Sequence, residues 1–350
     1  MFQKILIANR GEIAVRIIRA CRNMGIRSVA VYSKEDKDSL HVQLADQRIC
    51  IGEGPARNSY LNMERIVTAA LNMGADAIHP GFGFLSENAE FVRLCEKNGI
   101  TYIGPKADVI DSMGNKSHAR KTMMEAGVPV VPGTKEPVYD AETGIRLAEE
   151  IGYPVMIKAS SGGGGKGMRV AKSADEFEFQ FNMAQRESAN AFGDDTMYIE
   201  KFIENPRHVE IQVMGDKFGN VVALGERDCS VQRNHQKLIE ESPSPAINDE
   251  IRNAMNRDAV LAAKTVNYTN AGTIEFILDP KGTYYFMEMN TRIQVEHGVT
   301  EMVTGTDLII EQIRVAMGEP LSFNQEGIQL RGHAIECRIN AEIPLSLIHI

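Results

Sequence analysis

Several features that would place this chain in a common class are missing from it. No apolar run is long enough to span a membrane, so no membrane-spanning segment is expected. The formal net charge is −9, and this lack of excess positive charge disfavours a nucleic-acid partner. The five cysteines are odd in number and scattered, which argues against disulfides or a zinc site and favours a reducing cytoplasm. Because residues 1–4 lead directly into an apolar segment, we expect no signal peptide and a cytoplasmic protein.

Two familiar nucleotide-binding motifs are also incomplete. Residues 9–14 follow the first predicted strand but hold one of the three glycines of the dinucleotide fingerprint, so a structural role is favoured over NAD binding. The glycine-rich loop at 160–167 has no Ser or Thr after Lys166 and is followed by a strand pattern, which excludes a Walker A loop. No histidine lies beside Cys229 at a spacing that would indicate a catalytic pair. We therefore expect Cys229 to pack in the core rather than to act as a nucleophile.

What the chain does have is a regular alternation of strands and helices in its first third. Apolar patterns predict strands at 4–8, 27–31, 48–51, 75–78 and 101–103, with helices between them. This rhythm predicts a Rossmann-like, doubly wound α/β domain up to about residue 113. The glycine loop at 81–86 follows a strand end, and it fits a ligand-binding loop and a packed turn equally well. With 350 residues, two or three domains are expected.

The middle of the chain carries a strand, a glycine loop and a second strand. The strands are predicted at 155–159 and 168–171. This order resembles the flap that kinases lay over nucleotide phosphates, with a flexible linker as the alternative. Lys158, on the first strand, could hold a phosphate as a point charge.

The strongest functional signal lies in residues 288–297. Read as an extended segment, one face of it is polar throughout: Glu288, Asn290, Arg292, Gln294 and Glu296. A hairpin turn signal at 279–282 brings Glu275 opposite Glu288 or one place from it. Two such carboxylates repel each other, so we expect a cation between them. Because Glu275, Glu288 and Asn290 offer only oxygen ligands, Mg²⁺ or Mn²⁺ is predicted; a solvated face is the alternative.

The same row is too long for one reacting centre if it is straight. It would span roughly 26 Å from Glu288 to Glu296. We therefore predict that the backbone bends after Asn290. The first part would then bind a metal and nucleotide, and Arg292, Gln294 and Glu296 would face a second pocket for an anion and a base.

With these segments assembled, the chain resembles the biotin carboxylase family of ATP-grasp enzymes, of the type found in acetyl-CoA carboxylase. The resemblance runs from residue 1 to about 342 on six motifs in order: ILIANRGEIAVRIIRA, HPGFGFLSEN, KASSGGGGKGMR, RDCSVQRNHQK, EMNTRIQVEH and RGHAIECRINAE. It implies a mixed α/β and α+β architecture: an N-terminal domain at 1–113, and an ATP-grasp domain at 114–318 whose mobile lid lobe covers about 130–203. An incomplete C-terminal domain would begin at 319 and continue to 350.

The resemblance also assigns roles to individual residues. ATP would be bound by Lys116, Lys158, Gly162, Gly163, Gly164, Gly165, Lys166, Gly167, Glu200, Lys201, Ile203, His208, Gln232 and His235. Glu275, Glu288 and Asn290 would carry the metal ions, two being expected. The catalytic set would comprise Lys237 near the transferred phosphate, Arg292, Gln294 and Val295 on bicarbonate, Glu296 as the base, and Arg338 against the biotin enolate.

The implied reaction is the ATP- and bicarbonate-dependent carboxylation of biotin through carboxyphosphate. Biotin would be carried by a biotin carboxyl carrier protein, and this step would be the first half-reaction of acetyl-CoA carboxylase, leading to malonyl-CoA and fatty acids. Carboxyltransferase subunits are the further partners implied, and a homodimer is expected at full length. The alternatives are the corresponding part of a pyruvate, propionyl-CoA or urea carboxylase, and a non-catalytic protein that binds nucleotide.

The chain departs from the family pattern in two places. Gly298 stands where the family usually has proline, which would loosen the loop behind Glu296. The pattern stops after Glu342, and residues 343–350 do not continue it, so we expect a truncated fragment with a foreign or misread tail. The strand at 331–340 would then lack its partners and be poorly ordered, with Glu336 available to pair with Arg338.

Overall fold

The computed structural model describes residues 1–159, 168–192, 194–234, 236–339, 342–343 and 348–349. The chain divides into two compact units. The first comprises Met1–Val128, Arg207–Ile277 and Phe286–Ile350, and the second comprises Pro129–Pro206 and Leu278–Tyr285. Among the described residues, no helix combines the length and apolar character needed to cross a bilayer.

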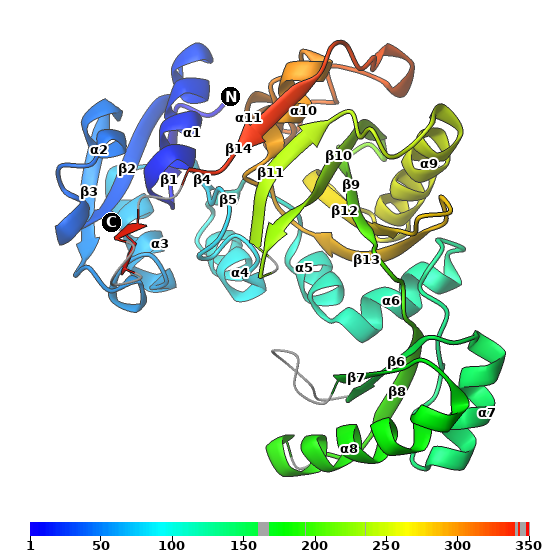
Figure 1. Ribbon diagram of the computed structural model, residues 1–350. Coiled ribbons are helices and arrows are strands. Elements are labelled where there is room, and N and C mark those ends of the chain that lie inside the picture. Colours follow the sequence, from blue (N-terminus) through cyan, green and yellow to red (C-terminus); the bar gives the residue numbers. More distant parts are fainter. Residues whose placement is uncertain (160–167, 193, 235, 340–341, 344–347, 350) are drawn as a thin grey trace. The chain divides into compact units, whose positions relative to one another are not determined.

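The first unit begins with a five-stranded parallel sheet in the order β3-β2-β1-β4-β5 (Figure 1). Its strands are β1 (Lys4–Ile7), β2 (Arg27–Ser33), β3 (Gln47–Gly52), β4 (Ala77–His79) and β5 (Thr101–Tyr102). The helical segments that join and follow them are α1 (Gly11–Asn23), η1 (Lys34–Asp36), α2 (Leu40–Leu44), η2 (Ala56–Asn58), α3 (Met63–Met73), α4 (Ala89–Lys97), α5 (Ala107–Gly114) and α6 (Lys116–Glu125).

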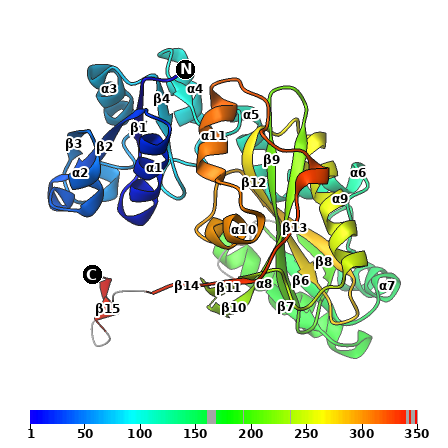
Figure 2. The ribbon, with the colours of Figure 1, turned by 90° about the horizontal axis from the view of Figure 1, so that it is seen from above.

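Helices cover both faces of this sheet, as Figure 2 shows for α1 and α3. Alternate side chains of a strand point to opposite faces, and β1 follows this rule. Ile5 and Ile7 belong to the core that contains the apolar side of α1, whereas Leu6 belongs to the core that contains α3 and α4. The predicted doubly wound α/β arrangement is therefore confirmed.

A six-stranded sheet follows in the order β13-β12-β9-β10-β11-β14. Its strands are β9 (Arg207–Gly215), β10 (Val221–Arg233), β11 (Gln236–Ser242), β12 (Asn270–Leu278), β13 (Tyr284–Asn290) and β14 (Ala334–Cys337). The remaining helical segments of this unit are α9 (Asp249–Thr265), α10 (His297–Thr304), α11 (Leu308–Ala316) and η3 (Gln325–Gly327). Asn248 caps α9, and its side chain accepts a 2.9 Å hydrogen bond from the Ile251 amide. Near the C-terminus, β15 (Glu342–Ile343) pairs with β16 (Ile348–His349).

The expectation that the strand around Arg338 lacks a partner is wrong. β14 pairs with β11 in antiparallel register, Cys337 opposite Ile239 and Glu336 opposite Glu240. The Arg338 amide extends this pairing by donating to the Leu238 carbonyl at 2.9 Å. Because β11 lies within this chain and offers a free edge, no additional segment is needed to satisfy one side of the strand.

The second unit contains a three-stranded antiparallel sheet in the order β7-β6-β8. Its elements are α7 (Ala141–Ile151), β6 (Val155–Ala159), β7 (Met168–Ala171), α8 (Ala174–Phe192) and β8 (Met197–Lys201). The predicted strands on either side of the glycine loop are present and pair with each other, Lys158 opposite Met168. The loop itself, residues 160–167, lies outside the described residues.

The core of the second unit depends on aromatic packing from α8. Phe177 is fully buried, stacks on Phe181 with ring centroids 5.7 Å apart, and meets Tyr153 edge-on at 6.5 Å. A Cβ atom on Gly144 of α7 would lie 2.6 Å from the Phe177 ring, so glycine is what allows α7 to approach α8.

We expect Phe177→Ala to destabilise the second unit by about 3–5 kcal/mol, because it removes a buried ring and leaves a cavity. Urea unfolding, followed through hydrogen exchange of the α8 amides, measures the change. The matched control is Phe179→Ala, whose ring lies on the same helix and is 66% exposed. A loss no larger than that of the control would contradict this account of the core.

Candidate active site

A cavity of about 770 Å³ in the first unit collects most of the polar residues singled out in the sequence. Its lining comprises Phe82, Gly83, Lys116, His208, Gln232, Asn234, Gln236, Lys237, Glu275, Met287, Glu288, Asn290, Arg292, Gln294, Val295, Glu296 and Arg338. The predicted metal trio and catalytic set all belong to it. Three of the predicted ATP residues, Lys116, His208 and Gln232, also line this cavity.

A larger hollow of about 1070 Å³ lies elsewhere in the first unit. Its cationic lining consists of Lys106, Lys217 and Lys264, all of which are exposed. We assign the chemistry to the smaller cavity, because buried and mutually paired ionic groups mark functional sites better than volume does.

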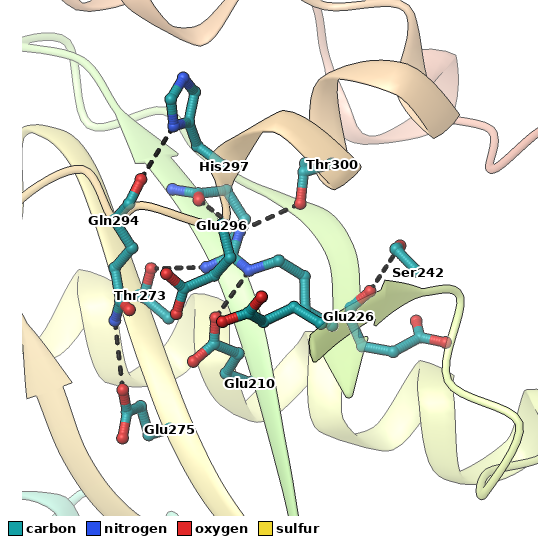
Figure 3. Close-up of polar contacts among 12 residues, drawn as sticks. Glu210, Glu226, Ser242, Thr273, Glu275, Gln294, Glu296, His297 and Thr300 are labelled. Atoms are coloured by element: carbon teal, nitrogen blue, oxygen red, sulfur yellow. Dashed lines mark hydrogen bonds and ion pairs between the residues drawn. The ribbon is translucent and has the colours of Figure 1, made fainter. Parts of the chain in front are cut away.

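A buried ion pair contacts Lys237, one of the residues that line the active-site cavity. Arg227 and Glu210 stand opposite each other on β10 and β9, both side chains are fully buried, and their charged atoms are 2.6 Å apart. Arg227 also donates to Gln212 at 2.7 Å, to Thr300 at 3.0 Å and to Thr273 at 3.1 Å. The side chains of Glu210, Thr273 and Thr300 are labelled in Figure 3. Burial opposes ionisation of Glu210, but Arg227 and Lys237 hold its pKa well below its usual range.

Lys237, from β11, is the central cation of the site. Its Nζ lies 2.6 Å from Glu210, 2.7 Å from Glu296, 3.0 Å from Glu275 and 3.1 Å from the side-chain amide oxygen of Gln294. An ammonium has three N–H donors, so these four acceptors compete for it. Burial would lower the pKa of Lys237, but the charges of Glu210 and Glu296 raise it, and the residue stays protonated.

His208, on β9, adds a second positive charge beside the same carboxylates. Its Nε2 lies 3.1 Å from Glu275 and 3.5 Å from Glu210, an ion-pair distance without the angles of a hydrogen bond. Burial alone would lower its pKa, whereas Glu210 and Glu275 raise it to about 9. Gln232 donates to the Cys229 carbonyl at 2.8 Å and lies 3.2 Å from Nδ1 of His208, which orients the ring.

The polar row bends where the sequence predicted. β13 ends at Asn290, and residues 291–296 form no strand or helix before α10 begins. The period-two reading therefore fails beyond Asn290. Val295, which a straight strand would place on the face opposite Gln294 and Glu296, lines the cavity together with them. Figure 3 shows the Gln294 side chain against Glu275, where its amide donates at 3.2 Å, and the His297 ring against the Gln294 carbonyl at 2.8 Å.

The predicted metal ligands are occupied by protein cations and amides. Glu275 accepts from Asn290 at 2.8 Å and faces Lys237 and His208. Glu288 pairs with Lys116 at 2.9 Å. Among the described residues, Glu275 is grouped closely enough for metal coordination with His208 and Glu210, and Glu288 is not a member of that group.

Arg292 is anchored from the N-terminal domain by a residue that the sequence did not single out. Its Nε donates to Glu87 at 2.8 Å, and the Glu87 carboxylate also accepts from the Thr291 amide at 3.2 Å. Glu87 follows the glycine loop at 81–86, which proves to be both a packed turn and a cavity wall. Gly81 has a φ of +63°, and a Cβ there would lie 3.0 Å from Asn9, while Phe82 and Gly83 line the cavity.

Arg338 directly follows β14 and lines the cavity, but its ion-pair partners differ from the expected one. Its guanidinium contacts Glu240 at 2.6 Å and Glu296 at 2.9 Å, and not the predicted Glu336. Glu240, like Glu210 and Arg227, was not recognised as functional from the sequence. β11 is mostly polar in sequence, so Glu240 does not stand out in it, and only the tertiary structure shows which charge it meets.

The predicted ATP residues of the second unit lie on and after β8 and on β6. Lys158 forms an ion pair with Glu200 across the sheet. Lys201 donates to the Gly152 and Tyr153 carbonyls at 2.7 and 2.8 Å, so it also fastens the segment before β6. Ile203 follows β8 and is half-buried. Gly162, Gly163, Gly164, Gly165, Lys166, Gly167 and His235 lie outside the described residues.

Cys229 agrees with its predicted structural role. It is fully buried, and burial raises the pKa of its thiol well above the usual range, which keeps it unreactive as a nucleophile.

Comparison with known proteins identifies the family. Residues 1–110 match the biotin carboxylase N-terminal domain, and residues 115–324 match the ATP-binding domain of the carbamoyl-phosphate synthase L chain. The chain is 61% identical over 345 residues to biotin carboxylase 1 of Bacillus subtilis, covering 98% of this chain and 77% of that protein. It belongs to the biotin carboxylase family.

Two further relatives extend this comparison. The chain is 60% identical over 340 residues to the chloroplastic biotin carboxylase 1 of Populus trichocarpa, covering 97% of itself but 64% of that longer protein. The 2-oxoglutarate carboxylase biotin carboxylase domain of Hydrogenobacter thermophilus, a dimer solved with MgADP, ADP and bicarbonate, superimposes with a TM-score of 0.85. Identity to that structure is 53%, with 99% of this chain and 76% of that chain covered.

These matches confirm the ATP-grasp fold and the enzyme class, an ATP-dependent carboxylating ligase. They support ATP-dependent carboxylation of biotin as the function of this biotin carboxylase homologue. The roles of single residues remain predictions, and they are argued below from the geometry of the cavity.

The buried ion pair of Arg227 and Glu210 leads to a prediction about stability. We expect Arg227→Met to destabilise the protein by about 3–5 kcal/mol, because Glu210 would be left charged and partly unpaired in the interior. Urea unfolding followed by circular dichroism measures this change. Adding Glu210→Gln should recover part of the loss. Arg146→Met, which removes an exposed pair with Glu150, should change little. Equal effects of the buried and exposed substitutions would contradict the assignment.

Proposed function

We propose that this chain is the biotin carboxylase component of an acetyl-CoA carboxylase, and that it carboxylates biotin on a biotin carboxyl carrier protein. The observation that carries the proposal is the meeting of Glu296 with Lys237 and Arg338 in one cavity beside Arg292. A carboxylate base and three cations suit a reaction that deprotonates bicarbonate and transfers a phosphoryl group. Carboxyltransferase subunits would use the product, in malonyl-CoA and fatty acid synthesis.

Bicarbonate would bind beside Arg292 and Glu296. Glu87 holds Arg292 through Nε, while the terminal nitrogens donate to the Asn290 side chain at 3.1 Å and to the Ile293 carbonyl at 3.4 Å. An anion bound by the guanidinium fork would share or replace these two contacts. The Glu296 oxygens are held 2.7 Å from Lys237 and 2.9 Å from Arg338, so the base has a fixed position. Glu296 would take the proton of bicarbonate as a bicarbonate oxygen attacks the γ-phosphate of ATP. ADP then leaves, and carboxyphosphate is formed.

The charges around Lys237 suit this transfer. Glu210, Glu275 and Glu296 hold the ammonium protonated in the cavity. An incoming phosphate would replace some of these acceptors and take up the charge. His208, whose pKa of about 9 keeps it protonated at neutral pH, would add a second cation near the phosphates. Lys116 and, from the second unit, Lys158, the glycine loop and the 200–203 segment complete the proposed ATP set.

The oxygen atoms of Glu275, Glu288 and Asn290 fit Mg²⁺ or Mn²⁺ by chemistry. All three line the same cavity, and their present partners include Lys116, Lys237 and His208. A metal ion bound with nucleotide would supply positive charge for the phosphates. These three residues would hold it, and the lysines that now neutralise the carboxylates would be free to bind phosphate.

Arg338 would act in the second step, where carboxyphosphate supplies the carboxyl group to biotin. Its guanidinium would stabilise the negative charge that develops on the ureido oxygen of biotin. The final acyl acceptor would be met in a separate carboxyltransferase. For this reason the cavity does not distinguish acetyl-CoA from 2-oxo acids, as the likeness to a 2-oxoglutarate carboxylase domain illustrates.

We expect Glu296→Ala to lower bicarbonate-dependent ATP hydrolysis by at least about a hundredfold, because the general base is lost. ATP affinity should be nearly unchanged, as measured by equilibrium binding. Glu326→Ala, at an exposed position in η3, is the control. A comparable loss of ATP affinity would place Glu296 at the nucleotide, and full activity would refute its role as the base.

We expect Glu288→Gln to raise the Mg²⁺ concentration needed for half-maximal ATP hydrolysis by at least about tenfold, because one charged oxygen is lost from the metal set. A Mg²⁺ titration at saturating ATP measures this shift. Glu301→Gln is the comparison, since Glu301 pairs with Arg16 on α1 and lies outside the cavity lining. An unchanged Mg²⁺ requirement would remove Glu288 from the metal site.

A further inference from the structure

Glu240 is a buried carboxylate that the proposed reaction does not yet use. It lies on β11, its side chain is fully buried, and its Oε1 accepts a 2.6 Å hydrogen bond from Nε of Arg338. Its Oε2 is also buried and receives no hydrogen bond from any of the described residues. The other side of the same guanidinium donates to Glu296 at 2.9 Å. Arg338 is therefore held between two buried carboxylates.

A second glutamate lies across from Glu240 on the neighbouring strand. The β11–β14 register places Glu336 directly opposite Glu240, so the two side chains share one face of the sheet. Like charges directly opposite each other are destabilising, and a shared proton removes the repulsion. Burial, together with Glu240 and Glu296, raises the pKa of Glu336 to about 7, and burial also raises the pKa of Glu240.

Charged residues from four neighbouring segments act on Glu240 and Glu336. Glu12 comes from α1, Glu296 precedes α10, Lys237 lies on β11, and Arg338 directly follows β14. His297, at the start of α10, acts on Glu12, where its positive charge opposes the rise in pKa that burial causes. The cations attract the ionised pair and the two other carboxylates repel it. One proton between the two carboxyl groups would remove the repulsion within the pair.

Gly298 makes room for this arrangement. A Cβ atom at position 298 would lie 3.3 Å from Oε2 of Glu336, closer than most real Cβ contacts. The family pattern usually has proline here. Glycine in this chain therefore leaves the Glu336 carboxyl in place without crowding.

We propose that Glu240 is a positioning residue that holds Arg338 against Glu296, and that Glu240 and the half-buried Glu336 opposite it share one proton. Glu240 would affect the reaction of biotin by positioning Arg338, so this inference rests on the proposed function. Glu240 does not touch the reacting atoms. It acts by fixing the guanidinium where charge develops on the ureido oxygen.

The first test separates the two half-steps of the reaction. We expect Glu240→Ala to lower kcat/KM for free biotin by about tenfold to a hundredfold, because a guanidinium displaced by about an ångström loses much of its effect. Bicarbonate-dependent ATP hydrolysis without biotin should fall clearly less, because Lys237 still holds Glu296 when Arg338 is displaced. Glu240→Gln preserves the volume and one acceptor and should rescue part of the biotin step. Equal losses in both assays, or no loss in either, would overturn the positioning role.

The second test concerns the shared proton and needs no activity. The folded-state pKa of Glu336 is raised, so the stability contributed by its neutral form is complete below its ordinary pKa. That contribution is lost as the pH rises through about 7. Glutamine stays neutral. The Tm of Glu336→Gln relative to the unmodified chain should therefore increase between about pH 5 and pH 8, and the exposed control Glu326→Gln should show no such trend.

A double-mutant cycle links the proton to Glu240. In a Glu240→Gln background, the pH-dependent gain from Glu336→Gln should shrink, because the carboxylate that raised the pKa of Glu336 is gone. An unchanged gain would overturn proton sharing. If the unmodified chain fails to carboxylate biotin, the proposed function fails on that result, while this cycle still decides whether the pair shares a proton.

Discussion

The structure of the site depends on one buried ion pair, Arg227 with Glu210. Two charges that are removed from water need complete pairing, and the neighbours of Arg227 supply it from β9, β12 and α10. The strands and the helix that carry the cavity are therefore fixed by the partners of one guanidinium. Glu210 then presents its second oxygen to Lys237, so the same pair that orders the interior also places the central cation.

From that pair the charges alternate in sign toward the edge of the sheet. Lys237 follows Glu210, Glu296 follows Lys237, and Arg338 and Glu240 complete the series. Each inner charge is tolerable because it lies between two of opposite sign, and Glu240 ends the series with Arg338 as its cation. Anionic substrates can enter such a series by replacing carboxylates around a lysine or arginine. The alternation thus links the stability of the cavity to its proposed chemistry.

Much of this could be read from the sequence, because local patterns determine it. Apolar periodicity located the strands of the parallel sheet, and the turn signal at 279–282 joined β12 to β13. The polar row at 288–296 and the length limit on it led to the predicted bend after Asn290. The family motifs, which are themselves runs of sequence, identified the family that the comparisons then confirmed.

By itself the sequence determined the element types, the order of the strands along the chain and the residue types available for chemistry, since these follow from local spacing. Only the tertiary structure decided the partners. Glu87 meets Arg292 across about two hundred residues, and Glu240 meets Arg338 across about a hundred. β14 finds β11 although the sequence suggested that it would lack a partner. Strand register and burial select which opposite charges meet, and neither quantity is encoded in any one segment of the chain.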